Sequence, residues 1–304
     1  APVNLYSVAC ASTSHCTAVG LYTDSSGYQQ GLLLTGSGSS WTAAEAPLPA
    51  GTDLNYYPYV SLVAVTCPSV TQCVAVGDYN TASGQHGLLL TGSGSSWTAL
   101  QEPGFLNAVT CPSATACVAV GGAIVTGSGS SWTATTSPLP ASDLNPELTA
   151  VTCRSASSCV AVGSYQVSSS SGGSLPLLVT GSGSSWTAVK APLVAGGPRV
   201  PAEALDTVSC PAASSCVAIG TFADANNKAQ ILLMSESGSS WSAAEGPLPS
   251  NAAPFSATGK SSLSPPHAVS LTCLSTSNCV AVGSYTDTAP QTEPLLLSGP
   301  DTVG

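Results

Sequence analysis

Six pairs of cysteines, each with five residues between its members, recur along this chain and account for all 12 of its cysteines. Each pair is flanked by two short runs rich in Val, Ala and Thr, as in Val65–Gly77, and such runs are typical of β-strands. A link this short forces an antiparallel hairpin, in which residues directly opposite one another are close enough for a disulfide. We therefore predict the disulfides Cys10–Cys16, Cys67–Cys73, Cys111–Cys117, Cys153–Cys159, Cys210–Cys216 and Cys273–Cys279.

Metal ligation is the other chemistry open to paired cysteines. Metal sites space their cysteines more closely and often recruit histidine. The chain has only 3 His, and of these only His15 lies inside a cysteine hairpin. We therefore expect no metal and no cofactor at the cysteine pairs.

A second motif follows five of the six hairpins. A Leu-rich run leads into Gly-Ser-Gly-Ser-Ser-Trp, which ends at Trp41, Trp97, Trp132 and Trp186, with a variant that contains Glu236 and ends at Trp241. The Leu-rich run predicts a third strand, the Gly/Ser part a tight turn, and Trp the start of a fourth strand. Each repeat is thus expected to be a four-stranded antiparallel meander.

Four strands in each of six repeats predict an all-β fold, a six-bladed β-propeller that forms one domain over residues 1–304. The strands are apolar on both faces, which fits sheets that are each covered by two neighbours. A solenoid would require more constant repeat lengths and polar caps. The sixth repeat has no Trp strand, so we expect a three-stranded last blade or an outer strand lost by truncation. The predicted blades are residues 1–46, 47–102, 103–137, 138–191, 192–246 and 247–304.

The composition limits the partners and the compartment. Charged residues are 7% of the chain, the net charge is −10, and there are 5 basic residues, so nucleic acid and anionic membrane surfaces are disfavoured. No apolar run approaches the roughly 20 residues of a membrane helix, so we expect no membrane insertion. Paired cysteines indicate an oxidising compartment. Because the chain starts at Ala1 without a leader, we expect a removed signal peptide and a secreted or cell-surface location.

The Gly/Ser turn followed by Trp resembles the Asp-box of bacterial neuraminidase-type repeats, Ser/Thr-x-Asp-x-Gly-x-x-Trp. Gly94 and Trp97 match its Gly and Trp, whereas Gly92 and Leu90 occupy the Asp and Ser/Thr positions. Together with the cysteine hairpin, the turn is similar to sialidase-like repeat proteins secreted by high-GC bacteria. The resemblance implies a propeller and no defined activity.

By the same resemblance, a neuraminidase needs three arginines around the substrate carboxylate. This chain has only Arg154 and Arg199, and Arg154 lies inside a cysteine hairpin. Sialidase chemistry is therefore disfavoured, and we expect a protein that is not an enzyme.

The meander places the cysteine hairpins and Gly/Ser turns at one edge of the blades and the links of variable length at the other. Binding residues concentrate in such variable loops. The richest link provides the candidates Asp53, Asn55, Tyr56, Tyr57 and Tyr59, which suit sugar stacking with hydroxyl hydrogen bonds, or a protein hot spot. Alternatively, these tyrosines anchor the loop on the blade.

Asp206 is the remaining binding candidate, and with Asn107 at the equivalent first-strand position it is a weak candidate for a metal at the mouth of a channel. The third repeat has almost no link between its second and third strands at residues 121–122, which predicts a notch in the rim.

Two further patterns favour structural roles. An aromatic residue follows the second strand in five repeats, and an aspartate two residues later in three of them is expected to cap a turn. The aromatic residues are Tyr22, Tyr79, Tyr165, Phe222 and Tyr285, and the aspartates are Asp24, Asp224 and Asp287.

Catalytic constellations are formally available but not distinctive. A Ser/His/Asp triad through His86 or His267 carries no signal in so Ser-rich a chain. A glycosidase needs two carboxylates at a defined separation. The carboxylates expected on the variable-loop edge are Asp53, Asp143, Glu147, Glu203 and Asp206.

Three functions remain open. The first is a secreted, non-catalytic propeller that binds a glycan or an extracellular protein partner. The second is an assembly subunit of an extracellular surface layer or filament, because low charge and a Ser/Thr-rich exterior permit close packing. The third is a polysaccharide-active glycosidase or lyase.

Overall fold

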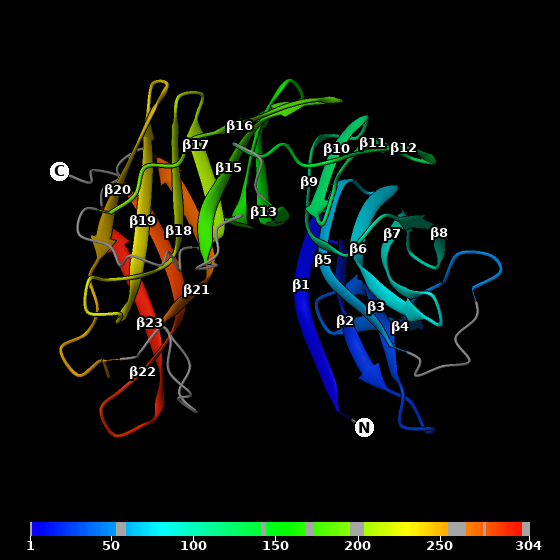
Figure 1. The fold of residues 1–304 in the computed structure, drawn as a ribbon. Coiled ribbons are helices and arrows are strands. Elements are labelled where there is room, and N and C mark those ends of the chain that lie inside the picture. Colours follow the sequence, from blue (N-terminus) through cyan, green and yellow to red (C-terminus); the bar gives the residue numbers. More distant parts are fainter. Residues whose placement is uncertain are drawn as a thin grey trace. The chain divides into compact units, whose positions relative to one another are not determined.

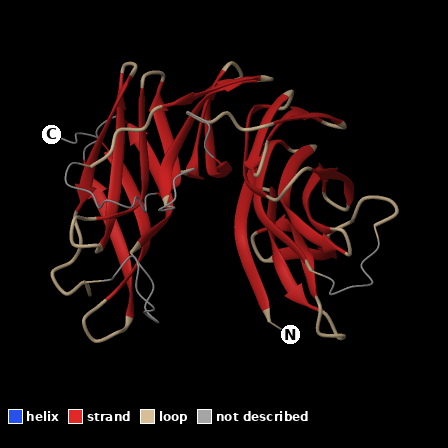
Figure 2. Cartoon of the chain, in the orientation of Figure 1, coloured by secondary structure: helices blue, strands red, loops and turns tan. Residues whose placement is uncertain are grey.

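The computed structural model describes residues 2–52, 59–140, 144–167, 173–194, 204–254, 266–275 and 278–299. These residues form 23 strands and no helix (Figure 2). The strands pair into six antiparallel sheets in chain order, five with four strands and the last with three. No helix in the described ranges is long and apolar enough to cross a membrane.

The chain divides into two compact units, the first with β1–β12 and the second with β13–β23, except that turn residues 155–157 and 182–185 group with the first. The strands of the first unit (Figure 1) are β1 (Val3–Ser12), β2 (His15–Thr23), β3 (Gln29–Ser37), β4 (Ser40–Glu45), β5 (Val60–Ser69), β6 (Gln72–Thr81), β7 (Gly84–Ser93), β8 (Ser96–Glu102), β9 (Leu106–Ser113), β10 (Ala116–Gly121), β11 (Ile124–Ser128) and β12 (Ser131–Thr135). The strands of the second unit are β13 (Leu144–Ser155), β14 (Ser158–Gln166), β15 (Ser174–Ser182), β16 (Ser185–Val189), β17 (Ala204–Ala212), β18 (Ser215–Ala223), β19 (Ala229–Ser237), β20 (Ser240–Gly246), β21 (His267–Ser275), β22 (Asn278–Thr286) and β23 (Thr292–Gly299).

The predicted fold class is confirmed. Each sheet carries one disulfide, all six predicted pairs are formed with Cα–Cα distances of 3.9–4.0 Å, and no cysteine is free. Strand number, order and pairing match a six-bladed β-propeller, and each sheet is one blade. Of the two outcomes expected for the sixth blade, the described residues form three strands, β21–β23.

The core lies between neighbouring blades of each unit, because the strands are apolar on both faces. In the first unit, Val19 and Leu33 of the first blade pack against Leu62 and Leu88 of the second. The other face of the second blade packs on the third, and in the second unit the fifth blade is covered by the fourth and the sixth. The missing polar alternation in the sequence therefore has the predicted cause.

A β-bulge in the first strand of the blade explains the glycine that ends each Cys-x-x-x-Gly run. In the second blade the pairing of β5 with β6 shifts between Leu62 and Ala64, so that Val63 is the extra residue. The bulge brings the carbonyl oxygen of Ser61 to 1.9 Å from where a Cβ on Gly77 would lie. Only glycine fits there. The same collision, at 1.9–2.1 Å, occurs at Gly20, Gly121, Gly163, Gly220 and Gly283.

The first glycine of the Gly/Ser motif has a similar cause. A Cβ on Gly36 would lie 2.1 Å from the carbonyl oxygen of Ser40, which starts the fourth strand. Gly299 holds the same position in the sixth blade, where no fourth strand is described, and a Cβ there would meet nothing within 4 Å. The fourth strand thus crowds this position in the first three blades, whereas the fifth blade accommodates Glu236 there opposite Trp241.

One ion pair bridges two blades at the cysteine edge of the second unit. Arg154, in the hairpin of the fourth blade, pairs with Glu236 in the turn motif of the fifth, and its Nη2 lies 2.7 Å from Cys216 Sγ. Both side chains are buried, 13% and 8% exposed. Burial raises the pKa of the Glu236 carboxyl, and the Arg154 guanidinium opposes this shift.

Candidate functional site

Four of the six predicted binding residues, namely Asp53, Asn55, Tyr56 and Tyr57, lie outside the described residues. Tyr59 belongs to the first unit and Asp206 to the second. The assignment of these six residues to a site therefore stays a prediction, and each described residue has its own surroundings.

Tyr59 is half-buried where the predicted loop joins β5. It forms a parallel bridge with Gln29 at the start of β3, and its carbonyl accepts a hydrogen bond from the Asn80 backbone N–H (3.0 Å). Burial, and then the nearby Asp78 carboxylate, raises the pKa of its phenol, while a hydrogen bond with Ser61 opposes the shift. Through its backbone, Tyr59 ties the loop to the first and second blades.

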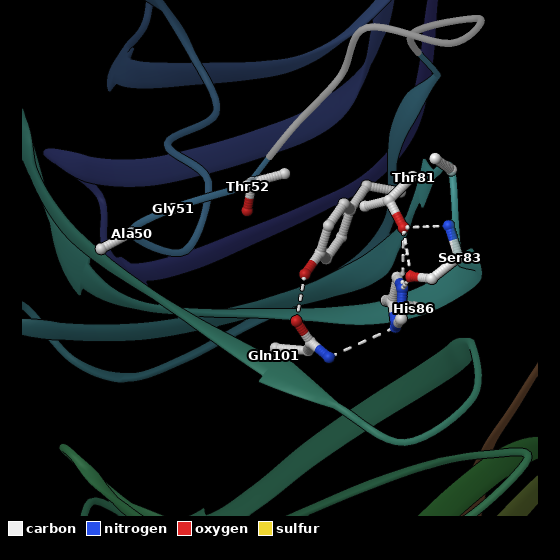
Figure 3. Close-up of a pocket in the computed structure, with 9 residues that line it drawn as sticks. Ala50, Gly51, Thr52, Thr81, Ser83, His86 and Gln101 are labelled. Carbon is white, nitrogen blue, oxygen red and sulfur yellow. Dashed lines mark hydrogen bonds between the residues drawn. The ribbon is translucent and has the colours of Figure 1, made fainter.

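Beside the other end of that loop, the second blade holds a hollow of about 320 Å³ (Figure 3). Its lining comes from the link after β4, from β6 and the turn after it, from β7 and from β8. The lining residues are Ala50, Gly51, Thr52, Tyr79, Thr81, Ala82, Ser83, His86 and Gln101, and none carries a fixed charge. The volume is at the small end of ligand pockets in proteins.

The polar side chains of the hollow form one hydrogen-bonded chain (Figure 3). The Tyr79 hydroxyl donates to Gln101 Oε1 (2.8 Å), and Gln101 Nε2 lies 3.3 Å from His86 Nδ1. An amide nitrogen can only donate, so Nδ1 is the acceptor and the neutral imidazole carries its proton on Nε2. That Nε2 lies 3.0 Å from both Thr81 Oγ1 and Ser83 Oγ.

This arrangement fixes the His86 ring and leaves hydrogen-bonding capacity at the mouth of the hollow. A hydroxyl has one donor and two acceptor sites. The Thr81 hydroxyl is filled, because it bonds His86, the Ser83 backbone N–H, the Ser83 hydroxyl and the Gly84 carbonyl. The Ser83 hydroxyl bonds only Thr81 and His86 within the described chain and keeps capacity. The fully buried Tyr79 ring packs against the His86 ring, with the two centroids 5.5 Å apart. Uncharged hydroxyl, amide and imidazole groups beside an aromatic ring are suited to a neutral polyhydroxylated ligand.

Sequence reasoning did not assign His86, Gln101, Thr81 or Ser83 to a binding site. The sequence did hold a signal, namely a histidine at a position where two other repeats have glutamine. His86 lies opposite Tyr79 on the neighbouring strand, and Gln30 and Gln230 lie opposite the equivalent aromatic residues of the first and fifth blades.

The repeated aromatic position has the structural role that was predicted. In three blades its hydroxyl bonds a side chain on the fourth strand or in the link before the blade. The bonds run from Tyr22 to Glu45 Oε2 (2.8 Å), from Tyr79 to Gln101 Oε1 (2.8 Å) and from Tyr285 to Asn251 Oδ1 (3.1 Å).

The three aspartates that follow cap turns, as predicted. Oδ1 of Asp224 accepts the backbone N–H groups of Asn226 and Lys228, both at 2.8 Å. Asp24 and Asp287 make the same pair of bonds in the first and sixth blades, at 2.8–3.0 Å. The side-chain hydrogen bond from Gln30, followed by one from the Tyr28 backbone, lowers the pKa of Asp24. These carboxylates are occupied by their own loops.

Asp206 occupies the bulge of β17, where the pairing with β18 shifts between Leu205 and Thr207. Its Oδ2 is buried and has no hydrogen-bond partner within the described ranges. Burial raises the pKa of this carboxyl to about 6, although the neighbouring His267 lowers it. An uncompensated buried carboxylate is costly. In the described chain no group of three His, Cys, Asp or Glu could hold a metal ion.

The predicted notch in the third blade corresponds to a hollow of about 250 Å³ at the tight β10–β11 connection. Its walls are small residues and backbone, from Pro103, Gly104, Gly122, Ala123, Ala134, Thr135 and Thr136.

Two Ser–His pairs correspond to the formal triad candidates. Ser83 Oγ lies 3.0 Å from His86 Nε2, but this nitrogen carries the proton because Nδ1 accepts from Gln101, so His86 is not placed to act as a base on Ser83. Ser284 Oγ lies 3.5 Å from His267 Nδ1, which is long for a nucleophile activated by a base. Asp53, Asp143 and Glu203 lie outside the described residues, and Glu147 is exposed on β13. Arg154 is engaged by Glu236 at the cysteine edge.

No protein-family model matches the chain, and no curated protein matches it. Among solved structures, the fucose-specific lectin from Aleuria aurantia aligns with 99% of this chain and 97% of its own, at 11% identity and a TM-score of 0.43. A variant of that lectin in complex with Fucalpha1-6GlcNAc aligns over the same shares at 10% identity and a TM-score of 0.44.

A further structure of the lectin, titled as a six-bladed beta-propeller with a novel fucose recognition mode, aligns with 99% of this chain and 97% of its own at 12% identity and a TM-score of 0.40. Similarities with TM-scores this low do not establish the fold, which is assigned from the strand pairing of this chain. None of the comparisons supports the resemblance to sialidase-like proteins or a bacterial origin.

Proposed function

We propose that the protein is a secreted, non-catalytic carbohydrate-binding propeller, and that the hollow around His86 is one of its binding sites. The observation that carries this proposal is the uncharged, hydrogen-bonded set of Tyr79, Gln101, His86, Thr81 and Ser83 in an open hollow on the variable-loop edge. Six disulfides support an oxidising, extracellular setting.

The lining indicates the chemical class of the ligand. It contains no Lys or Arg, so a sialylated, sulfated or phosphorylated sugar would lose its hydration without an ionic partner. A neutral sugar ring instead offers vicinal hydroxyls to Ser83 and Gln101, whose side chains line the hollow and are exposed. Asp53, Tyr56 and Tyr57, predicted from the sequence as binding residues, lie outside the described residues.

A glycan array probed with the fluorescently labelled chain tests the proposal. We expect neutral glycans to be bound and acidic glycans of the same core to be bound no better. Methyl glycosides of glucose, galactose, mannose and fucose then compete in solution. Absence of binding to any neutral glycan, with the six disulfides intact, would contradict the proposal.

A matched pair of variants locates the site. His86→Ala should weaken binding of the best array ligand at least about tenfold, because the half-buried ring that positions Gln101 and Ser83 is lost. His15→Ala is the control, since His15 is exposed at the cysteine edge and bonds Ser14 (3.1 Å). Equal affinity in both variants would move the site away from the hollow.

A further inference from the structure

The turn between the second and third strands is built differently in the second blade. In the first and fifth blades a glutamine side chain donates to the aspartate that caps this turn. The bonds run from Gln30 Nε2 to Asp24 Oδ2 (3.1 Å) and from Gln230 Nε2 to Asp224 Oδ2 (3.4 Å). The second blade has Thr81 and His86 at the corresponding positions, and His86 Nε2 lies 3.0 Å from Thr81 Oγ1. An imidazole, which can change charge, thus replaces an amide, which cannot.

This turn determines which ring nitrogen of His86 carries the proton. Thr81 Oγ1 accepts the Ser83 backbone N–H (3.2 Å), and its single proton has acceptors in the Gly84 carbonyl (3.4 Å) and the Ser83 hydroxyl (2.8 Å). Toward His86 the Thr81 hydroxyl is therefore an acceptor, and it takes the Nε2–H as the aspartates take an amide N–H in the other two blades. Nδ1 is left without a proton, 3.3 Å from Gln101 Nε2.

A second proton on His86 is incompatible with this arrangement. The new Nδ1–H would point at the Gln101 amide nitrogen, so that two donors would face each other (Figure 3). Rotation of the Gln101 amide by half a turn relieves this conflict, because it brings Oε1 to the Nδ1–H and Nε2 to the Tyr79 hydroxyl. That hydroxyl, which donates to Oε1 (2.8 Å) while His86 is neutral, then becomes the acceptor.

The Tyr79 proton has an alternative acceptor after the rotation. The Thr52 side chain lies within hydrogen-bonding reach of the Tyr79 phenol, and Thr52 Oγ1 donates to the Pro49 carbonyl (2.7 Å). Thr52 can therefore accept the Tyr79 proton and keep its own bond to Pro49. The hydrogen bonds from His86 through Gln101 to Tyr79 can thus reverse their direction without leaving a buried group unpaired.

In the described part of the hollow, the other side chains around His86 carry no charge. They come from the link before β5, from β6 and its turn, and from β8, and Tyr79 is the only other titratable group among them. Burial raises the pKa of the Tyr79 phenol, so it stays neutral where histidines ordinarily titrate. Asp78 and Glu102 are the strand neighbours of Tyr79 and Gln101 and therefore point to the opposite face of the blade.

We propose that His86 is a pH-sensitive positioning residue, whose charging rotates the Gln101 amide and weakens the binding of a neutral glycan in the hollow. The effect on the glycan rests on the proposed function, whereas the rotation of the amide requires no ligand. Gln101 is exposed at the hollow, so the rotation exchanges an acceptor for a donor where a sugar hydroxyl would bind. Sugar hydroxyls that fit one arrangement do not fit the other.

Nuclear magnetic resonance of the full, oxidised, ¹⁵N-labelled chain tests the rotation without a ligand. We expect His86 to carry its proton on Nε2 at about pH 8, and the His86 ring and the Gln101 side-chain amide to shift with one common midpoint as the pH falls to about 5.5. In the His86→Gln variant the Gln101 amide should stay constant over the same range. A proton on Nδ1 at the higher pH, a ring that does not titrate, or an amide that does not follow the ring would overturn the proposal.

The affinity for the best neutral glycan of the array is the second readout. Between about pH 8 and about pH 5.5 the parent chain should bind about tenfold more weakly, because hydrogen-bonding groups become mismatched. His86→Gln keeps the kind of donor that Gln30 and Gln230 provide in their blades, and its affinity should change less than about twofold over this range. The variant retains the other histidines, so a pH dependence equal to that of the parent would overturn the assignment to His86.

The two readouts separate this inference from the proposed function. Glycan binding with an affinity that does not vary with pH would overturn the control of binding by His86 and leave the proposed function in place. Absence of glycan binding at every pH would contradict the proposed function and the control of binding together, whatever the amide does.

Discussion

The second and fifth blades share one pattern of strand pairing but use their polar residues differently. In the fifth blade, Glu236 pairs with Arg154, the Asp224 carboxylate is filled by its own turn, and Phe222 stands where the second blade has Tyr79. In the second blade, Tyr79 and His86 instead form part of a hydrogen-bonded chain along an open hollow.

The difference separates polar residues that hold the blade from those free to meet a ligand. A carboxylate that accepts two backbone N–H groups has little capacity for an external hydroxyl. The Ser83 hydroxyl and the Gln101 amide keep such capacity. The same strand pattern thus carries polar side chains that are fully bonded within the protein in the fifth blade (a closed set) and side chains with spare hydrogen-bonding capacity in the second (an open set). Substitutions in the closed set should therefore change stability, and substitutions in the open set should change binding.

The largest effect is expected at the ion pair of the fifth blade. Arg154→Pro restores the Cys-Pro of three other hairpins but leaves Glu236 buried without its partner, which should lower the free energy of unfolding by about 3–5 kcal/mol. Adding Glu236→Gly, the residue of the other turns, should recover most of that loss. Denaturant unfolding measures both. A double variant as unstable as Arg154→Pro alone would show that the loss does not come from the unpaired Glu236 carboxylate.

The next effect depends on pH and concerns Asp206. Its pKa is about 6 in the folded chain and 3.8 in a model peptide, so the folded state binds the proton more tightly. The free energy of unfolding should therefore fall as pH rises from about 4 to 6, by about 3 kcal/mol, and stay lower above that window. Asp206→Asn should match the parent near pH 4 and exceed it at pH 7.5. A stability gap that is constant with pH would contradict this.

A smaller effect tests the turn of the first blade against the sixth. Gly36→Ala places a Cβ 2.1 Å from the carbonyl oxygen of Ser40 and should destabilise the chain by about 2 kcal/mol. Gly299→Ala is the matched control, because its Cβ would meet nothing within 4 Å and should leave the thermal midpoint nearly unchanged. Equal losses would mean that the fourth strand is not what requires this glycine.

The smallest effect compares the two loops directly. Asp224→Ala removes the acceptor for two backbone N–H groups and should cost about 1 kcal/mol, with faster hydrogen exchange at Asn226 and Lys228. Ser83→Ala in the second blade should change stability by less than about 0.5 kcal/mol. If Ser83→Ala were the more destabilising change, the hydrogen-bonded side chains around His86 would serve to stabilise the second blade rather than to bind a ligand.

Much of the architecture could be predicted because it is local in sequence. Cysteines six positions apart can only close a hairpin, and Trp after a Gly/Ser turn starts the next strand. The capping by Asp24, Asp224 and Asp287 was likewise within reach, since donor and acceptor are two to four residues apart.

Contacts between distant residues could not be predicted in this way. Arg154 and Glu236 are 82 positions apart, and only their shared departure from the repeat pattern hints at their pairing. The three tyrosines after Thr52 are also a more conspicuous sequence feature than the single His86. The repeat pattern identifies which positions face a neighbouring blade. It does not identify the side chain that each position contacts, because that depends on packing between blades.

The disulfides have one more consequence, which concerns how such a chain is made and how it changes. Every bridge spans a sequence separation of six, so each hairpin can oxidise as soon as it enters an oxidising compartment, before any distant thiol competes. Duplication or deletion of one whole repeat in the gene would therefore add or remove a complete disulfide and leave no cysteine unpaired in the other repeats.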